Sequence, residues 1–222
     1  MISFCLRKIC SSASFLISPP YCVSCKQFLS EREPLCAGCR GQIYPVVSQP
    51  LAITATHEIQ VYAMTAYDGI IRSLVLGKNY GQRLPSIQLG QLLAESDCCP
   101  WASFDVLVPT PLHWRRYALR GFNQAAIIAH TVARVRPWLQ VVPALGRVRH
   151  TRSQSALGKG ERRGNVESCF ELDPRYARLL EGRRVLLVDD VMTTGATLRA
   201  MGKALKKVEV RSLAAVVAAR TL

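Results

Sequence analysis

A short apolar segment followed by two acids limits most strongly what this chain can fold into. Residues Val185 to Val188 form an uninterrupted run of valine and leucine, typical of a strand that is buried on both faces of a parallel sheet. We expect this strand to stop at Asp189 and Asp190, which would then lie at the carboxyl edge of the sheet, where open α/β sheets bind ligands. The segment therefore predicts an α/β fold with a ligand site at the end of this strand.

The turn after the two acids has the composition of an anion-binding loop. Gly195 allows a positive φ angle, and Leu198, Met201 and Leu205 follow at helical spacing. The N–H groups of the turn and of the helix N-terminus would form a cradle for a phosphate. A ribose 5-phosphate suits such a site, because its hydroxyls can donate to the acids. The predicted site comprises Asp189, Asp190, Thr193, Thr194, Gly195, Ala196 and Thr197.

Three other interpretations compete with a ribose phosphate site. A nucleotide-hydrolysing P-loop is excluded, because no Gly-Lys pair in the chain is followed by serine or threonine. A phosphoacceptor receiver domain also begins with a strand ending in Asp-Asp, but too little chain follows Asp190 to complete one. A solvated strand end without a ligand would rarely combine two acids, a glycine and three threonines. The segment resembles the 5-phosphoribosyl-1-pyrophosphate (PRPP) signature of type I phosphoribosyltransferases.

Size and charge narrow the class of protein further. The 222 residues suffice for one full α/β domain with a small appendage. With 29 lysines and arginines against 15 acids, the net charge of +14 favours nucleotides, pyrophosphate or nucleic acid as partners, although a basic surface without a specific partner is the alternative. No apolar run approaches the roughly 20 residues of a membrane span. We interpret the N-terminal segment as lacking an export signal, which predicts a cytoplasmic protein with reduced thiols.

Four cysteines near the N-terminus have the spacing of a metal-binding module. Cys22-x2-Cys25 is followed, after ten residues, by Cys36-x2-Cys39. Two such turns facing each other complete a tetrahedron of thiolates around a structural Zn²⁺, with iron or disulfides as the less favoured alternatives. Prolines in the segment 44–50 then indicate a boundary. We therefore expect a lead-in and zinc module at residues 1–50 and a phosphoribosyltransferase-like domain at 51–222.

Periodicity predicts the other elements of the larger domain. Alternation indicates a strand over 58–67, and apolar runs indicate further strands over 105–109, 166–172 and 208–220. Helical spacing appears around Ile70 to Val75, over 86–95 and over 124–134, the last with Asn123 as its N-cap. Strands that alternate with helices in this way favour a mostly parallel sheet flanked by helices.

Two basic segments are predicted as loops beside the ligand site. The first follows the strand at 105–109, and its arginines are suited to clamp a pyrophosphate. The second, over 147–166, has the composition of a mobile lid, with a disordered loop as the alternative. Aromatic residues 114, 117 and 122 in the first segment would stack on bases of single-stranded nucleic acid, unless they are buried. The polar residues predicted to act in these loops are Arg115, Arg116, Arg120, Arg149, Arg152 and Gln154.

These motifs, taken together and in this order, make the chain resemble the ComF family, also called the GntX or DNA-utilisation group. The resemblance departs from the usual pattern near Lys78, where Asn79 separates the lysine from Tyr80. It extends over nearly the full length. It is carried by the four cysteines, by the opening segment, by Pro109-Thr110-Pro111-Leu112-His113 with Arg116 and Arg120-Gly121-Phe122-Asn123-Gln124, and by Thr151, Gln154, Glu161, Arg162 and Asn165-Val166.

The resemblance implies a type I phosphoribosyltransferase-like domain behind a zinc module, in a protein connected with competence or with the use of external DNA. Its implied partners are PRPP or a related nucleotide-like molecule, single-stranded DNA and DNA-uptake proteins. The residues leave enzymatic turnover open. The alternative is an active phosphoribosyltransferase of nucleotide salvage, which would use Mg²⁺ to release pyrophosphate from PRPP and would have no DNA role.

Overall fold

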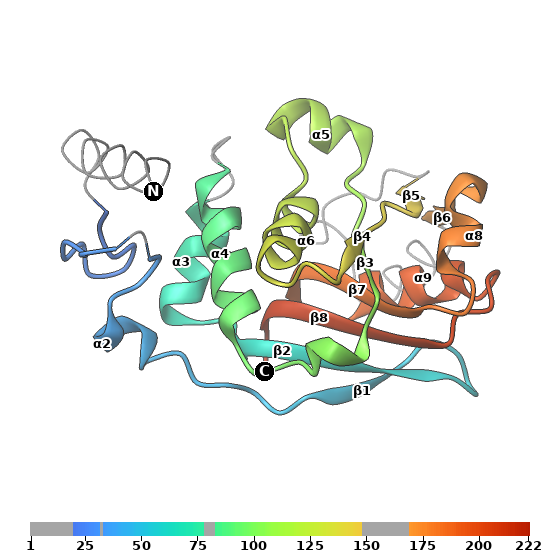
Figure 1. Ribbon diagram of the computed structural model, residues 1–222, viewed down its shortest axis with the longest axis horizontal. Helices are drawn as coiled ribbons and strands as arrows, with labels where there is room; N and C mark the ends of the chain where they lie inside the picture. The colour runs from blue at the N-terminus through green and yellow to red at the C-terminus, as the bar shows by residue number, and fades with distance from the viewer. Residues whose placement is uncertain (1–19, 32, 78–82, 148–168) are drawn as a thin grey trace, which may run out of the picture. The chain divides into compact units, whose positions relative to one another are not determined.

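The computed structural model describes residues 20–31, 33–77, 83–147 and 169–222 (Figure 1). The chain divides into two compact units, Met1–Ile43 and Tyr44–Leu222. A division between residues 50 and 51 would instead cut through the first strand of the larger unit, β1 (Gln49–Ala52). The described part of the smaller unit contains one short helix, α2 (Ala37–Arg40), and a bridge between Tyr21 and Phe28.

The larger unit is built on a six-stranded sheet in the order β1-β2-β8-β7-β3-β4. Only the β1–β2 pair is antiparallel, and the other four pairs are parallel. The predicted fold class, an α/β domain with a mostly parallel sheet, is therefore confirmed. Besides β1, the strands of this sheet are β2 (Glu58–Ala66), β3 (Val106–Pro109), β4 (Gln140–Val141), β7 (Arg184–Met192) and β8 (Ser212–Arg220).

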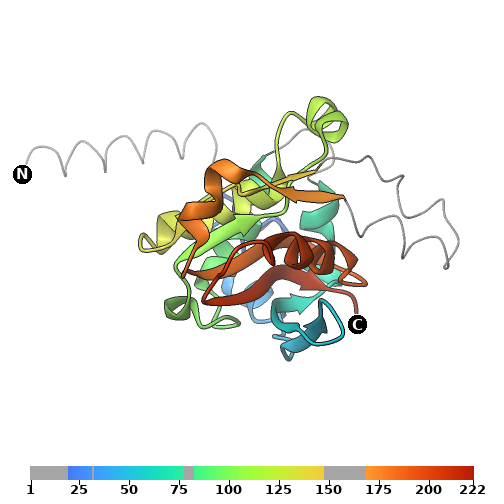
Figure 2. The same cartoon turned by 90° about the vertical axis from the view of Figure 1, so that its right-hand side faces the viewer.

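Helices pack against both faces of this sheet (Figures 1 and 2). Helices α4 (Leu84–Glu95) and α6 (Gln124–Val135) pack together on one face, with α3 (Gly69–Gly77) beside α4. On the other face lies α9 (Ala196–Leu205), whose apolar side chains join those of β7 and β8 in one buried cluster. Residues Val185 to Val188 are fully buried between these layers, as the apolar run predicts.

A small two-stranded ladder accompanies the main sheet. It pairs β5 (Leu145–Arg147) with β6 (Phe170–Leu172), and β6 contacts α9. The short helices η4 (Pro174–Tyr176) and α8 (Ala177–Leu180) then lead to β7. Predicted residues 166–168 of the β6 strand lie outside the described residues.

An ion pair fixes the amino ends of two central strands. The carboxylate of Asp105, just before β3, accepts hydrogen bonds from the Nε, Nη2 and backbone N–H of Arg184 on β7, with the shortest at 2.6 Å. These hydrogen bonds lower the pKa of Asp105 to about 2. The pair therefore sets the register of β3 against β7, and with it the position of the opposite, carboxyl edge.

Two sequence-based expectations need correction. The strand predicted to stop at the two acids continues through both of them to Met192, because β8 is equally long and pairs with β7 up to Arg220. The segment predicted as a basic loop after β3 contains a helix, α5 (Trp114–Arg120). The ring of His113 accepts a hydrogen bond from the N–H of Arg115 at the start of this helix, and Gly121, with a φ of 74°, ends it.

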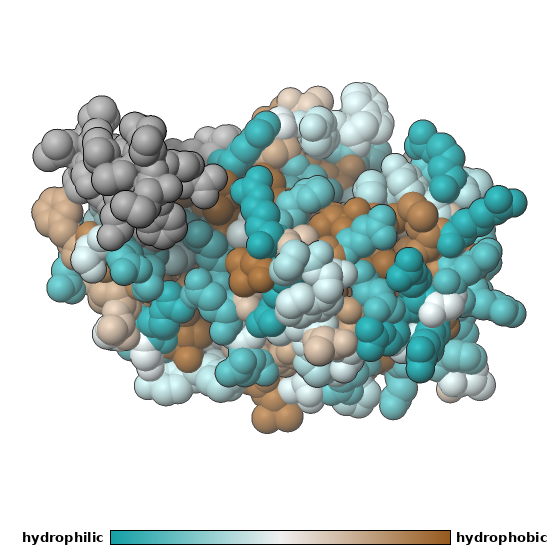
Figure 3. All heavy atoms as spheres, in the orientation of Figure 1, coloured by the Kyte–Doolittle hydropathy of each residue, from teal (hydrophilic) through white to brown (hydrophobic). Residues whose placement is uncertain are grey.

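The surface is predominantly polar on the face shown in Figure 3, where hydrophobic residues appear in patches between hydrophilic ones. Among the described residues, no helix combines the length and the hydropathy needed to cross a membrane.

Candidate functional site

At the carboxyl edge of the sheet, β7 extends beyond its neighbour β3. Strand β3 ends at Pro109, opposite Val188, so beyond this point β7 pairs only with β8. Thr110 closes the end of β3, because its N–H and its hydroxyl both donate to the carbonyl of Val188, at 2.9 and 3.1 Å. Among the described residues, no strand lies on the β3 side of Asp189 and Asp190, and α/β sheets bind ligands at such positions.

The turn between β7 and α9 presents the backbone N–H groups of a helix N-terminus. Gly195 has a φ of 69°, which confirms the positive angle expected from the sequence, and its carbonyl accepts the N–H of Arg199. The first N–H groups of a helix have no acceptor within it; here Ala196 N–H lies 3.4 Å from the hydroxyl of Thr194. These groups and the helix dipole favour an anion at this end of α9.

Two residues of strand β1 contact the turn and the start of α9. The side chain of Leu51 packs so closely against Gly195 that a Cβ atom there would lie 2.7 Å from Leu51 Cδ1. Arg199 Nε also donates to the carbonyl of Ala52, at 2.8 Å. Glycine at position 195 is thus required twice, by its backbone angle and by this contact.

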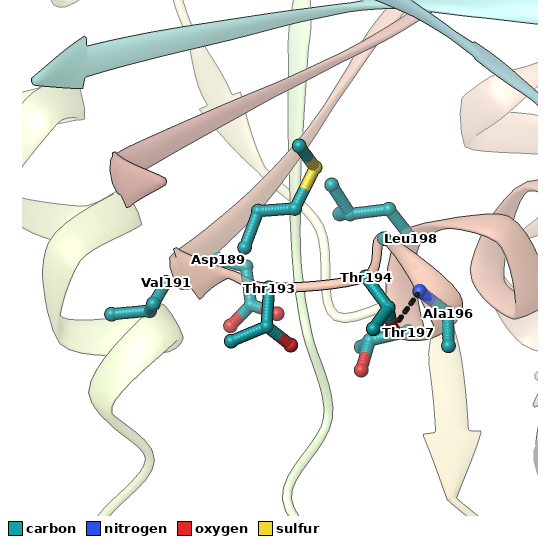
Figure 4. Close-up of a pocket in the computed structure, with 9 residues that line it drawn as sticks. Asp189, Val191, Thr193, Thr194, Ala196, Thr197 and Leu198 are labelled. Carbon is teal, nitrogen blue, oxygen red and sulfur yellow. Dashed lines mark hydrogen bonds between the residues drawn. The ribbon is translucent and has the colours of Figure 1, made fainter. Parts of the chain in front are cut away.

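One pocket gathers most of the residues predicted to bind ribose phosphate. Figure 4 shows that Asp189, Thr193 and Thr197 direct oxygen atoms to the same side of the turn, whereas Leu198 points the other way, into the core. The threonines at 193 and 194 are exposed and Thr197 is half-buried, so the hydroxyls are accessible. The pocket is lined by Asp189, Val191, Met192, Thr193, Thr194, Gly195, Ala196, Thr197 and Leu198.

The two acids have different positions. Asp189 lines the pocket, while Asp190 is not among the lining residues. Each acid also caps the backbone that follows it: Asp189 Oδ1 accepts the N–H of Asp190 at 2.9 Å, and Asp190 Oδ1 accepts the N–H of Val191 at 2.7 Å. Both residues are half-buried, and these hydrogen bonds hold their carboxylates in a fixed orientation.

Helix α5 divides the arginines predicted to bind pyrophosphate between two faces. Arg116 and Arg120 are half-buried and share one face with buried His113, at helical spacing. Arg115 is exposed on the other face, with its Cζ atom 5.3 Å from the centre of the Trp114 ring. Phe122 is buried, with the guanidinium of Arg83 over its ring, so for this aromatic residue the buried alternative holds.

An arginine outside the predicted set interacts electrostatically with Asp189. Arg147, the last residue of β5, is half-buried, and its guanidinium lies over the ring of Phe170, with Cζ 5.3 Å from the ring centre. Burial lowers its pKa, the charge of Arg116 lowers it further, and the charge of Asp189 raises it. The sequence places Arg147 at the start of a basic segment, without a signal that it ends an inward-facing strand.

The other predicted polar residues fall in segments that are not described. Arg149, Arg152 and Gln154, together with residues 148–166 of the lid predicted over 147–166, lie outside the described residues, as does Lys78.

The four N-terminal cysteines form a cluster suited to a metal ion. Their Sγ atoms all lie within 4.8 Å of one another, and those of Cys25 and Cys36 are 3.7 Å apart. Four thiolates around Zn²⁺, each at about 2.3 Å, would be about 3.8 Å apart, which fits this spacing. Burial raises the pKa of Cys22, but hydrogen bonds from backbone N–H groups outweigh it and lower the pKa to about 6. The cluster can therefore hold a metal ion, with all four positions filled by protein.

Comparison with known proteins agrees with this geometry. Residues 120–221, which include α6, β7, the β7–α9 turn and β8, match the family model of the phosphoribosyl transferase domain. This match lies within the larger unit and covers less than half of the chain, and the parallel sheet and the pocket at its carboxyl edge agree with it. Among solved structures, a Thermus thermophilus protein, TT1426, is 20% identical over 62% of this chain and 83% of its own, with a TM-score of 0.35.

The curated relatives of this chain are named as competence or DNA utilization proteins. Competence protein F of Haemophilus influenzae is 37% identical over 49% of this chain and 47% of its own length. DNA utilization protein YhgH of Escherichia coli O157:H7 is 35% identical over 42% and 39%, and competence protein ComFC of Bacillus subtilis is 37% identical over 42% and 35%. The chain is thus similar to proteins named competence protein F, ComFC and DNA utilization protein YhgH, as the motifs predict, and the matched region spans less than half of each of these relatives.

Proposed function

We propose that this protein binds PRPP, or a related ribose 5-phosphate ligand, at the β7–α9 turn and serves the uptake or utilisation of DNA. The observation that carries the proposal is the pocket in which Asp189, Thr193 and Thr197 share one side of a helix N-terminus. The names of the relatives, competence protein F and DNA utilization protein, support the biological role.

The residues of the pocket suit the two ends of a ribose 5-phosphate. The phosphate would accept hydrogen bonds from the N–H groups at the start of α9 and from the hydroxyls of Thr194 and Thr197. The ribose hydroxyls would donate to Asp189, with Asp190 as the second acid. The same carboxylates are oxygen ligands of the kind that Mg²⁺ prefers, and Mg²⁺ would accompany PRPP by neutralising its phosphates. A cytoplasmic location fits both this ligand and reduced thiols.

Calorimetric titration tests the pocket. Wild-type protein should bind PRPP in the presence of Mg²⁺, and binding should be lost in the variant that combines Asp189→Asn with Asp190→Asn. Asp173→Asn is the matched control, because it makes the same change at an exposed ion pair with Arg175 away from the pocket. Unchanged PRPP affinity in the double variant would refute the assignment of the site.

The metal of the cysteine cluster is proposed to be a structural zinc. The observation behind it is the set of four clustered sulfurs without an oxygen or nitrogen donor, a composition typical of closed zinc sites. Native mass spectrometry should detect one bound zinc that Cys36→Ser releases and that Cys98→Ser, outside the cluster, retains. Bound iron, or zinc retained by Cys36→Ser, would contradict this proposal.

Direct contact with single-stranded DNA is proposed for the outer face of α5, which stands away from the sheet in both Figures 1 and 2. No residue of this helix is buried, and Trp114 and Tyr117 are 66% and 53% exposed beside Arg115. Exposed rings that accompany a cation suit the stacking of bases and the neutralisation of phosphates. DNA-uptake proteins remain the expected protein partners.

Fluorescence anisotropy with a labelled single-stranded oligonucleotide tests this surface. Trp114→Ala with Tyr117→Ala should weaken binding at least about tenfold, since each stacked base is worth about 1–3 kcal/mol. Leu119→Ala is the control, because Leu119 is 87% exposed on the same helix but cannot stack. The logarithm of the affinity should fall with the logarithm of the salt concentration by about 0.7 per phosphate contact. A flat salt response would refute DNA binding by these residues.

The alternative function is an active phosphoribosyltransferase in nucleotide salvage, supported by the matched family. It would displace pyrophosphate from C1 of PRPP through an oxocarbenium-like centre, with a base or an amine as the acceptor. A screen of bases and amines for pyrophosphate release that depends on PRPP separates this alternative from a binding protein. Release with one acceptor, and its loss in Asp189→Asn, would establish the transferase.

A further inference from the structure

A hairpin in the smaller unit holds two aromatic side chains next to each other. Tyr21 and Phe28 form an antiparallel bridge. The backbone hydrogen bonds on either side of it run from Cys22 N–H to Gln27 O and from Leu29 N–H to Pro20 O, at 2.8 and 2.9 Å. A bridge between two such hydrogen bonds is a non-hydrogen-bonded pair, in which the Cα atoms are about 4.5 Å apart and the side chains share one face. The two rings therefore form a common surface.

Both rings are accessible, although the hairpin itself is anchored. Tyr21 is 49% exposed and Phe28 is 73% exposed. Cys22, which directly follows Tyr21, is fully buried and belongs to the cysteine cluster. Because successive residues of a bridged segment point to opposite faces, a metal ion in the cluster would fix the hairpin from the face away from the rings. An exposed pair of large rings on such a support is typical of a binding surface.

A lysine beside the rings is kept in an unfavourable backbone conformation. Lys26 has a φ of 64°, and among the described residues it alone combines a positive φ angle with a side chain other than that of glycine. Glycine would adopt this angle without strain, so the lysine side chain is expected to have a role. Its Nζ atom donates to the carbonyl of Val23 at 2.9 Å and lies 5.5 Å from the centre of the Tyr21 ring. A positive charge is thus held next to the aromatic surface.

We propose that Tyr21, Phe28 and Lys26 form a second surface for single-stranded DNA, with bases stacked on the two rings and a phosphate at the lysine. This inference rests on the proposed DNA role and adds a contact in the smaller unit to the one at α5. Aromatic residues on neighbouring strands bind successive bases with little sequence preference. Residues 20–30 contain Lys26 but no other lysine, no arginine and no acid, and the net charge of the chain is +14. A polyanion is therefore favoured over an uncharged peptide.

Fluorescence anisotropy of the full chain with a labelled single-stranded oligonucleotide tests the two rings. Tyr21→Ala with Phe28→Ala should weaken binding at least about tenfold, because two stacked bases lose their support. Tyr44→Ala is the matched control, because this residue is also 73% exposed but lies at the start of the larger unit; the affinity should stay within about twofold of wild type. Native mass spectrometry should find the same metal content in the double variant as in wild type, which shows that the cysteine cluster is intact.

Substitution of Lys26 separates its charge from its place in the turn. Lys26→Gly relieves the positive φ angle and should fold even if the double variant does not. Its affinity should fall, and the slope of the logarithm of the affinity against the logarithm of the salt concentration should become shallower by about 0.7, the value for one phosphate contact. Lys26→Arg keeps the cation and should keep the wild-type slope. An unchanged slope in Lys26→Gly would mean that the lysine only closes the turn, which would overturn the inference.

The α5 variant, Trp114→Ala with Tyr117→Ala, distinguishes failure of this inference from failure of the proposed function. Loss of affinity in both the α5 variant and the hairpin variant supports two DNA surfaces on one chain. Loss in the α5 variant alone leaves the DNA role in place and overturns the surface at Tyr21 and Phe28. If the wild-type protein does not bind the oligonucleotide, the proposed DNA role itself fails, and this inference fails with it.

Discussion

Substitution of Gly195 by alanine tests how the phosphate turn is built. The residue has a φ of 69°, and an alanine in this left-handed conformation costs about 1–2 kcal/mol. Its Cβ would also lie 2.7 and 3.1 Å from the two Cδ atoms of Leu51, which is only 8% exposed. Overpacking of this kind costs about 1–3 kcal/mol. We therefore expect Gly195→Ala to lower the free energy of unfolding by about 2–5 kcal/mol.

Gly182 provides a matched control for the backbone contribution. Its φ is 65°, but no heavy atom lies within 4 Å of its would-be Cβ, so Gly182→Ala should cost only the backbone part. Urea unfolding followed by circular dichroism would measure both variants and the combination of Gly195→Ala with Leu51→Ala. The combined variant should lose less stability than the sum of the single ones, because truncation of Leu51 makes room. Equal losses at the two glycines, or strict additivity with Leu51, would refute the close approach.

Three further variants test the scaffold around the site. Asp105→Asn should lower the free energy of unfolding by about 1 kcal/mol near pH 7, after allowance for partial exposure of the pair. Because the pKa of Asp105 is lowered to about 2 from 3.8, this difference should vanish as the pH falls from about 4 to about 2. Urea unfolding at several pH values would measure it. Asn123→Ala should lower the free energy of unfolding by about 1–2 kcal/mol, because Asn123 accepts the N–H of Ala126 as the cap of α6 and donates to the carbonyl of Thr110. An unchanged unfolding midpoint would contradict this role. Gly202→Ala should lower the free energy of unfolding by about 1 kcal/mol in the same assay, because the new Cβ would lie 2.6 Å from Ile53 Cδ1. This clash should outweigh the better helix propensity of alanine. A stabilising effect would contradict the close contact between Gly202 and Ile53.

Features that depend on local sequence could be predicted. The buried run at 185–188 needs only its own composition, and the cap at Asn123 needs only the residues that follow it, so both appear in the structure as expected. The positive φ of Gly195 follows in the same way from a glycine between a strand and a helix.

Features that depend on distant partners could not be predicted. The length of β7 is set by β8, which pairs with it beyond the two acids. Helix α5 is an exception, because its cap at His113 and its final glycine at 121 are local, but the polar composition of this segment favours a loop. The inward position of Arg147 depends on its pairing with Phe170 across the ladder, a residue far away in the sequence.

The central claim is that the β7–α9 turn holds the phosphate of a ribose 5-phosphate ligand. Amide NMR spectra recorded during a titration with ribose 5-phosphate test it most directly, because each N–H of the turn reports on its own acceptor. The account predicts that the signals of Thr194, Gly195, Ala196 and Thr197 shift together and saturate, while those of the cysteine cluster stay in place. Saturable shifts elsewhere that leave these four amides unmoved would contradict it.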